Sequence, residues 1–79
     1  MLNIKVLGPG CNNCKRLEAN ARQAVESLGI EAVIEKVTTY DEIHKYPILA
    51  TPGLVVNEKL VSAGRVPEAA EIAGWLKQS

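Results

Sequence analysis

Two cysteines, Cys11 and Cys14, are the residues of this chain whose type and spacing suggest chemistry. They form one Cys-Asn-Asn-Cys segment directly after Gly8-Pro9-Gly10, and the 79 residues contain no other cysteine. A thiolate can attack a disulfide, and a second thiol nearby can resolve the mixed disulfide that forms. A disulfide that closes so short a loop adds only about 2 kcal/mol in the chain-entropy picture. The spacing therefore favours reactivity, or a soft-metal site, over a structural staple.

The segments around this pair place it where a strand gives way to a helix. Residues 2–7 alternate loosely and are rich in branched side chains, which predicts a strand that Gly8-Pro9-Gly10 breaks. Apolar residues then recur at spacings of three and four, which is typical of one helix face: Cys14, Leu17, Ala21, Val25 and Leu28. Gly29 follows as a C-terminal stop. A helix of about 16 residues is therefore expected to begin near the cysteines.

The N-terminus of that helix is expected to lower the pKa of a neighbouring thiol. It carries roughly half a positive charge and several unpaired N–H groups. A cysteine pKa near 8.5 falls to about 3.5–7.5 in such settings. Residues 1–17 also contain Lys5, Lys15 and Arg16 and no acidic residue. We expect Cys11 to be the exposed nucleophile and Cys14, one turn later on the apolar face, to be more buried.

Residues 30–63 predict four further elements. Residues 30–37 predict a second strand with Ala32-Val33-Ile34 as its apolar centre, and residues 39–45 a short helix. Thr39 is the candidate N-cap of this helix, with Glu42 three residues on. Residues 54–56 and 59–63 predict an antiparallel hairpin across Asn57-Glu58, whose turn type stays open.

A final helix is predicted to open at Pro67 and to bury a stripe of apolar residues, namely Ala69, Ile72, Ala73 and Leu76. Tyr40, Tyr46 and Trp75 are expected to pack around the core. The order β-α-β-α-β-β-α requires a parallel strand pair first and antiparallel pairing later. We therefore predict one α/β domain over residues 1–79, with a mixed four-stranded sheet flanked by three helices.

With this pair of cysteines and this order of elements, the chain resembles the thioredoxin superfamily. The resemblance rests on Cys11-Asn12-Asn13-Cys14 at a strand-to-helix junction and on Thr51-Pro52-Gly53-Leu54 before a hairpin. The short length, Gly8-Pro9-Gly10 and Gly64 are similar to its small, glutaredoxin-sized redox-active disulfide proteins of bacteria and archaea. The resemblance covers nearly the whole chain. It implies a thioredoxin-like fold, Cys11 as attacking cysteine, Cys14 as resolving cysteine and a cis peptide bond before Pro52. It also implies that the Thr51 backbone pairs with an extended substrate segment.

Four further residues are taken as supporting the site: Lys5, Gly10, Asn12 and Asn13. The pair Asn12-Asn13 differs from the Gly-Pro of thioredoxins and the Pro-Tyr of glutaredoxins, and this pair helps to set the redox potential. Lys5 stands six residues before Cys11, where thioredoxins carry a buried carboxylate. Either its stem packs on a thinly covered sheet face while its ammonium group reaches water, or the ammonium group supports the thiolate electrostatically.

The favoured function is thiol–disulfide exchange with protein substrates, with electrons supplied by a disulfide reductase such as a flavin enzyme or another dithiol protein. It needs no cofactor beyond the redox-active Cys11–Cys14 disulfide. One alternative is a soft-metal binding or delivery module that uses the same sulfurs. For zinc, His44 is the other candidate ligand, although a lone histidine in a polar helix is usually solvated. A further alternative is a non-catalytic domain that binds extended peptide along Pro52.

Composition excludes several other classes of protein. Lys plus Arg and Asp plus Glu each number nine, so the net charge is zero, which argues against a general nucleic-acid binder. No apolar run approaches the roughly 18 residues of a membrane span. The N-terminus lacks the basic head and cleavage site of a signal peptide. We therefore expect a cytoplasmic monomer.

Overall fold

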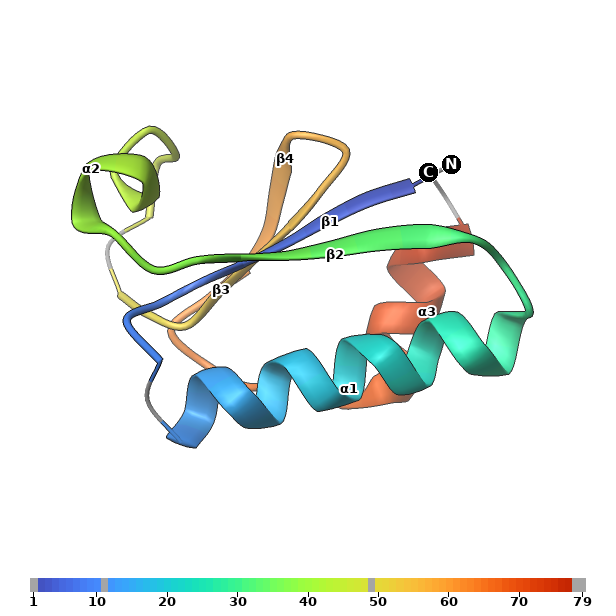
Figure 1. Cartoon of the computed structure of the whole chain (residues 1–79). Helices are drawn as coiled ribbons and strands as arrows, with labels where there is room; N and C mark the ends of the chain where they lie inside the picture. The colour runs from blue at the N-terminus through green and yellow to red at the C-terminus, as the bar shows by residue number, and fades with distance from the viewer. Residues whose placement is uncertain (1, 11, 49, 78–79) are drawn as a thin grey trace.

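One mixed sheet organises the chain (Figure 1). The computed structural model describes residues 2–10, 12–48 and 50–77. Its elements are β1 (Leu2–Leu7), α1 (Asn12–Leu28), β2 (Ala32–Val37), α2 (Tyr40–Ile43), β3 (Gly53–Val56), β4 (Lys59–Ala63) and α3 (Ala69–Lys77). The strand order is β2-β1-β3-β4, with β1 parallel to β2 and the other two pairs antiparallel. The predicted fold class is confirmed.

The sheet has one well-covered face and one thinly covered face. In Figure 1, α1 and α3 lie together beneath the sheet, and the short α2 lies at its opposite side. Ile4 and Val6 of β1 are buried in the cluster that α1 and α3 cover. Leu7, which points the other way, is buried with Ile43 of α2 and Val55 of β3. Alternate side chains of β1 therefore pack into two separate hydrophobic clusters, one on each face of the sheet.

Helix α1 begins at Asn12, two residues before the expected stripe, and it ends at Leu28. Its buried residues are Cys14, Leu17, Ala21 and Ala24. The buried face of the helix therefore includes Ala24, whereas Val25 of the predicted stripe is only partly buried. Gly29 follows with a φ of 63°, a left-handed conformation that suits a helix stop.

The boundaries of two short elements differ from the prediction. Strand β2 begins at Ala32 rather than at residue 30, and Val33 is 48% exposed because β2 lies at the edge of the sheet. Helix α2 ends at Ile43 rather than at residue 45. Thr39 is its N-cap residue, but the threonine side chain makes no capping hydrogen bond. Glu42 pairs with Lys45 instead, with 3.1 Å between their nitrogen and oxygen.

The start of the last helix and the placement of Tyr40 also correct the prediction. Helix α3 begins at Ala69, and the carbonyl of Glu68 accepts the N–H of Ile72, so Pro67 lies before the helix. The carbonyl of the buried Pro67 accepts a 3.0 Å hydrogen bond from the Asn20 side chain and so ties this loop to α1. Tyr40 was expected to pack, yet it is 60% exposed. Trp75 packs against the core as predicted.

The hairpin turn is settled by its backbone. Asn57 and Glu58 have φ values of 49° and 68°, and positive φ at both central residues defines a type I′ turn, which matches the twist of the flanking strands. Glycine would adopt these angles more easily than glutamate at the second place. Glu58 has a compensating contact, because its carboxylate accepts hydrogen bonds of 2.8 Å from both Lys5 Nζ and Tyr46 OH.

Lys5 is therefore paired rather than simply solvated. Its side chain is 25% exposed on the thinly covered face, and its ammonium group also lies 3.1 Å from the Tyr46 hydroxyl. The hydrogen bond to Glu58, and then that to Tyr46, raises the pKa of Lys5 above its ordinary value. The hydrogen bond from Lys5 is the main cause that lowers the pKa of Glu58. This cluster links β1, the loop after α2 and the hairpin turn.

The pKa shift of Glu58 predicts an acid-dependent stability. A carboxyl group whose pKa is lower in the folded state stabilises the fold above its unfolded pKa, near 4.3, and this is lost as the pH falls through the folded pKa. Glu58→Gln should therefore lower the melting temperature at pH 7, and this gap should be smaller at about pH 3, below the unfolded pKa. Circular dichroism melts of both proteins at the two pH values measure it. Glu42→Gln, which breaks an exposed pair on α2, is the matched control. A Glu58→Gln gap of equal size at both pH values would contradict the role of the ion pair.

Candidate functional site

The sheet brings two segments together at the carboxyl end of β1. Leu7 of β1 is the register partner of Gly53 of the antiparallel β3. Gly8, which follows Leu7, therefore lies next to Pro52, which precedes Gly53. The Gly8 N–H donates to the Val37 carbonyl at 2.9 Å, which holds the start of the loop against β2. The Pro52 carbonyl accepts the N–H of Gly64 at 3.0 Å, which holds the other segment against the end of β4. The two loops are therefore fixed by backbone hydrogen bonds.

Cys14 lies in the first turn of α1 and is 5% exposed, as its place on the apolar face predicted. Its sulfur lies against Gly8: a Cβ atom on Gly8 would collide with Cys14 Sγ, and it would lie 3.9 Å from the Pro52 Cα. Because Gly8 has no side chain, the Cys14 sulfur can occupy the space beside it. The sequence predicts Gly8 as the end of a strand and as part of the superfamily resemblance, but it does not reveal the contact between Gly8 and the Cys14 sulfur. The available signal was a glycine three residues before Cys11. A glycine at this place is equally typical of a turn and of a close contact with a neighbouring side chain.

The peptide bond between Thr51 and Pro52 is cis. Pro52 is buried and Thr51 is exposed, so the segment presents Thr51 to solvent beside the buried proline. Gly10 is exposed and has a φ of 95°, which a residue with a side chain rarely adopts. The structure thus brings Gly8, Cys14 and Pro52 together, with Thr51 next to them in the chain.

Cys11 lies outside the described residues, so its role as nucleophile and its lowered pKa stay predictions. Asn12 and Asn13 open α1 and are both exposed. The first turn of α1 contains no acidic residue, so no carboxylate offsets the partial positive charge at this end of the helix. One of the two interpretations of Lys5 makes its ammonium group an electrostatic partner of the thiolate, but that group contacts Glu58 and Tyr46 on the other face of the sheet.

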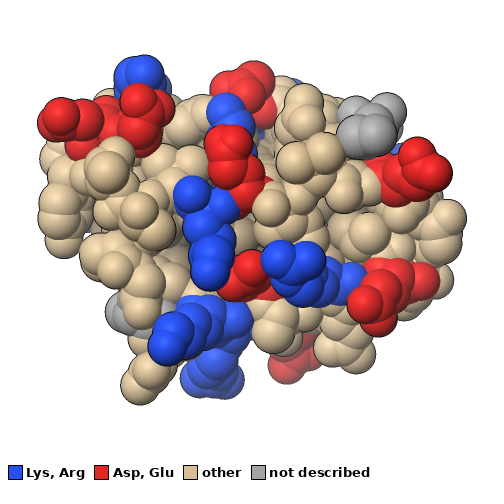
Figure 2. Space-filling view, in the orientation of Figure 1, with Lys and Arg blue, Asp and Glu red and all other residues tan. Residues whose placement is uncertain are grey.

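A small hollow of about 80 Å³ borders Cys14. Its lining includes Lys15, Glu18 and Lys36 together with Gly8. The Glu18 carboxylate lies 2.9 Å from Arg22 and 3.7 Å from Lys36. Figure 2 shows Lys and Arg side chains interleaved with acidic ones over the face that carries α1 and β2. The buried cysteine therefore neighbours a rim with charges of both signs.

The described residues hold no group of three or more His, Cys, Asp and Glu side chains suited to a metal ion. His44 is exposed at the end of α2, and its ring lies 6.0 Å from that of Tyr40, measured between centroids. Within residues 2–10, 12–48 and 50–77, no helix combines the length and the apolar character that crossing a bilayer requires.

A family model described as a thioredoxin domain matches residues 2–77. The chain belongs to the thioredoxin family. The thioredoxin of Methanothermobacter thermautotrophicus is 46% identical to it over 72 residues, which cover 91% of this chain and 94% of that protein. The thioredoxin of Methanocaldococcus jannaschii is 39% identical over 77 residues, which cover 98% and 88%. Membership assigns thiol–disulfide oxidoreductase chemistry at the level of the family.

Among solved structures, the germline-specific thioredoxin Deadhead of Drosophila melanogaster superposes with a TM-score of 0.68. The match covers 98% of this chain and 79% of the Deadhead chain at 13% identity, so it shows the thioredoxin fold alone. The fold and the superfamily resemblance predicted from the cysteine pair and Thr51-Pro52 are confirmed.

Proposed function

We propose that this thioredoxin-family protein exchanges its Cys11–Cys14 dithiol with disulfides of protein substrates. The observation that carries the proposal is the packing of the buried Cys14 sulfur against Gly8, beside the cis Thr51–Pro52 segment. A sulfur held in this way, at the first turn of a helix that starts directly after Cys11, suits a resolving role. Its burial keeps it from competing for bulky substrates, so the attack falls to Cys11.

The exchange proceeds in two balanced steps. The Cys11 thiolate attacks one sulfur of a substrate disulfide; the substrate S–S bond breaks, a Cys11–substrate disulfide forms, and one substrate thiolate leaves and takes up a proton. Cys14 then loses its proton, and its thiolate attacks the Cys11 sulfur. The Cys11–Cys14 disulfide forms as the second substrate thiolate leaves and is protonated. Two electrons pass to the substrate, so the dithiol is itself the carrier.

The Thr51–Pro52 segment supports the binding of substrate. Thr51 is exposed and precedes the buried proline, so its backbone is the natural partner of an extended substrate strand. Gly10, Asn12 and Asn13 are exposed around the first turn of α1 and leave this side open to a second polypeptide. Thioredoxins generally receive electrons from reductases, and we propose that a flavin or dithiol reductase reduces this protein. A compartment that keeps thiols reduced, such as the cytoplasm, suits that cycle.

Mass spectrometry of the purified protein before and after reduction tests the proposal. Oxidised protein should gain two hydrogens on reduction, and the reduced protein should then reduce a small disulfide such as hydroxyethyl disulfide. The Cys11→Ser variant is the control and should do neither, because no intramolecular disulfide can form. Stoichiometric metal that persists with no such mass change would favour the metal-binding alternative. A protein that binds disulfide-free peptide but exchanges no disulfide would favour the non-catalytic one.

A further inference from the structure

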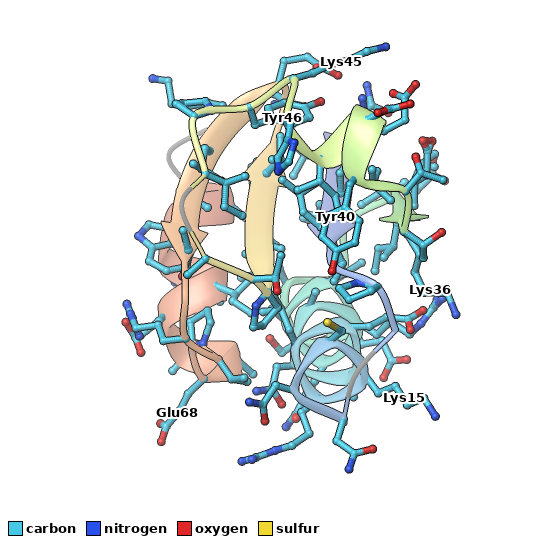
Figure 3. The ribbon with its side chains drawn as sticks, turned by 90° about the vertical axis from the view of Figure 1, so that its left-hand side faces the viewer. Lys15, Lys36, Tyr40, Lys45, Tyr46 and Glu68 are labelled. Carbon is cyan, nitrogen blue, oxygen red and sulfur yellow. The ribbon has the colours of Figure 1, made fainter. Side chains whose placement is uncertain are left out.

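Tyr40 is an aromatic side chain with 60% exposure at the start of α2. Its ring lies tilted against that of His44, with 6.0 Å between the centroids and 42° between the planes. Tyrosine offers a large apolar surface with a polar tip, which is why it is enriched where proteins bind other molecules. Figure 3 shows Tyr40 on the side of the molecule that also presents the start of α1, with its hydroxyl directed toward that helix.

Tyr40 and His44 border a hollow of about 250 Å³. The lining continues from them through Ile43, Ile48 and Ala50 to Thr51. Thr51 is the residue that precedes Pro52, and the Pro52 backbone lies beside the Gly8–Cys14 contact. The hollow is therefore continuous with the segment along which the proposed function lays the substrate.

The size and the chemistry of the hollow restrict what can occupy it. Pockets for drug-sized ligands are about 300–1,000 Å³, so this smaller space suits a single side chain. None of the six lining residues that the structure describes is Lys, Arg, Asp or Glu, so these residues offer no carboxylate, ammonium or guanidinium group for an ion pair. The tilted ring pair offers a face and an edge to a third ring.

We propose that this hollow, the Tyr40 pocket, binds an aromatic side chain that neighbours the reacting cysteine of the substrate. The inference rests on the proposed function and adds a substrate class to it. In an extended segment paired with Thr51, successive side chains point to opposite sides. The two side chains that flank the substrate cysteine therefore point to the side opposite to the cysteine, toward α2, and Tyr40 and His44 receive one of them. Disulfides flanked by an aromatic residue are accordingly reduced faster.

Two synthetic peptides test the pocket, each a symmetric disulfide of the sequence Gly-Gly-Xaa-Cys-Gly-Gly with tryptophan or alanine as Xaa. The second-order rate constant for reduction by the reduced protein is measured for each peptide. The tryptophan peptide should react about three- to tenfold faster, the range that one aromatic contact gives. Tyr40→Ala should bring the ratio of the two rate constants to about one, and Tyr40→Phe should keep most of the preference.

Val33→Ala is the matched control, because Val33 is the other large hydrophobic residue found exposed among those described, and it does not line the hollow. It should retain the full preference. Equal rates for the two peptides with the parent protein, or an undiminished ratio in Tyr40→Ala, would overturn the pocket while leaving the exchange reaction in place. A dimer that sedimentation detects and Tyr40→Ala dissociates would show that a second copy occupies the hollow, which also overturns it. A parent protein that reduces neither the peptides nor hydroxyethyl disulfide would overturn the proposed function itself, and the pocket with it.

Discussion

The Cys14→Ser variant should accumulate long-lived mixed disulfides with protein substrates through Cys11, whereas Cys11→Ser should accumulate almost none. The reason is that a serine at position 14 cannot attack the Cys11 sulfur, so the intermediate of the first exchange step persists. Non-reducing electrophoresis after incubation with oxidised insulin measures the adducts, and reduction with dithiothreitol should release them.

Two controls bear on this result. The double variant with serine at both positions should form no adduct. The Cys14→Ser substitution should also leave the fold intact, because serine has nearly the same volume as the cysteine it replaces in the small space beside Gly8. Equal trapping by the two single variants would show that either sulfur can attack, and preferential trapping by Cys11→Ser would reverse the assigned roles.

Gly8→Ala should both destabilise the protein and slow the second exchange step. The added methyl group would collide with the buried Cys14 sulfur, so the sulfur or the backbone around Gly8 must shift. Overpacking of this kind costs about 1–3 kcal/mol of unfolding free energy. Urea unfolding of the reduced protein measures that cost. The rate at which the mixed disulfide is resolved should fall as well, because the sulfur leaves the place it holds beside Pro52.

A double-mutant cycle isolates the contact between position 8 and the sulfur. In a Cys14→Ala background, the nearest remaining atom is the Cβ of residue 14, at an ordinary distance of 3.5 Å, so adding a methyl group to Gly8 should cost much less. Gly74→Ala is a matched glycine control, because Gly74 lies in α3 with open space around its missing Cβ, and helix propensity should stabilise it by about 0.5–1 kcal/mol. An equal cost of Gly8→Ala in both cysteine backgrounds would show that the sulfur is not what excludes the methyl group.

The features predicted from the sequence are those that local periodicity determines. The strand at residues 2–7, the helix that ends before Gly29 and the two-residue hairpin all follow from spacings within a few residues. The element order then restricted the topology, because a parallel pair needs a crossover and a two-residue gap needs an antiparallel hairpin. The burial of Cys14 followed from its place on the helix face.

The features that the sequence did not reveal depend on residues that are far apart in the chain. The Lys5–Tyr46–Glu58 cluster joins residues up to 53 positions apart, and no local pattern pairs them. The contact between Gly8 and the Cys14 sulfur depends on how α1 docks on β1. Pro67 is a good first-turn residue by type, but the Asn20 side chain binds its carbonyl and the helix begins two residues later. Tyr40 was expected to pack because aromatic residues usually do, and its exposure points instead to a role at the surface.

The direction of β1 has a consequence for attaching the protein to other materials. Leu2 and Lys77 border one hollow together with Leu28, at the end of β1 opposite to Gly8. Six residues of extended strand span about 20 Å, which separates this end from the Cys14–Pro52 edge. A resin, an electrode or a fused domain joined near either of these residues would hold the molecule with its reactive edge facing outward. Immobilised copies would therefore share one orientation and remain open to bulky disulfide substrates.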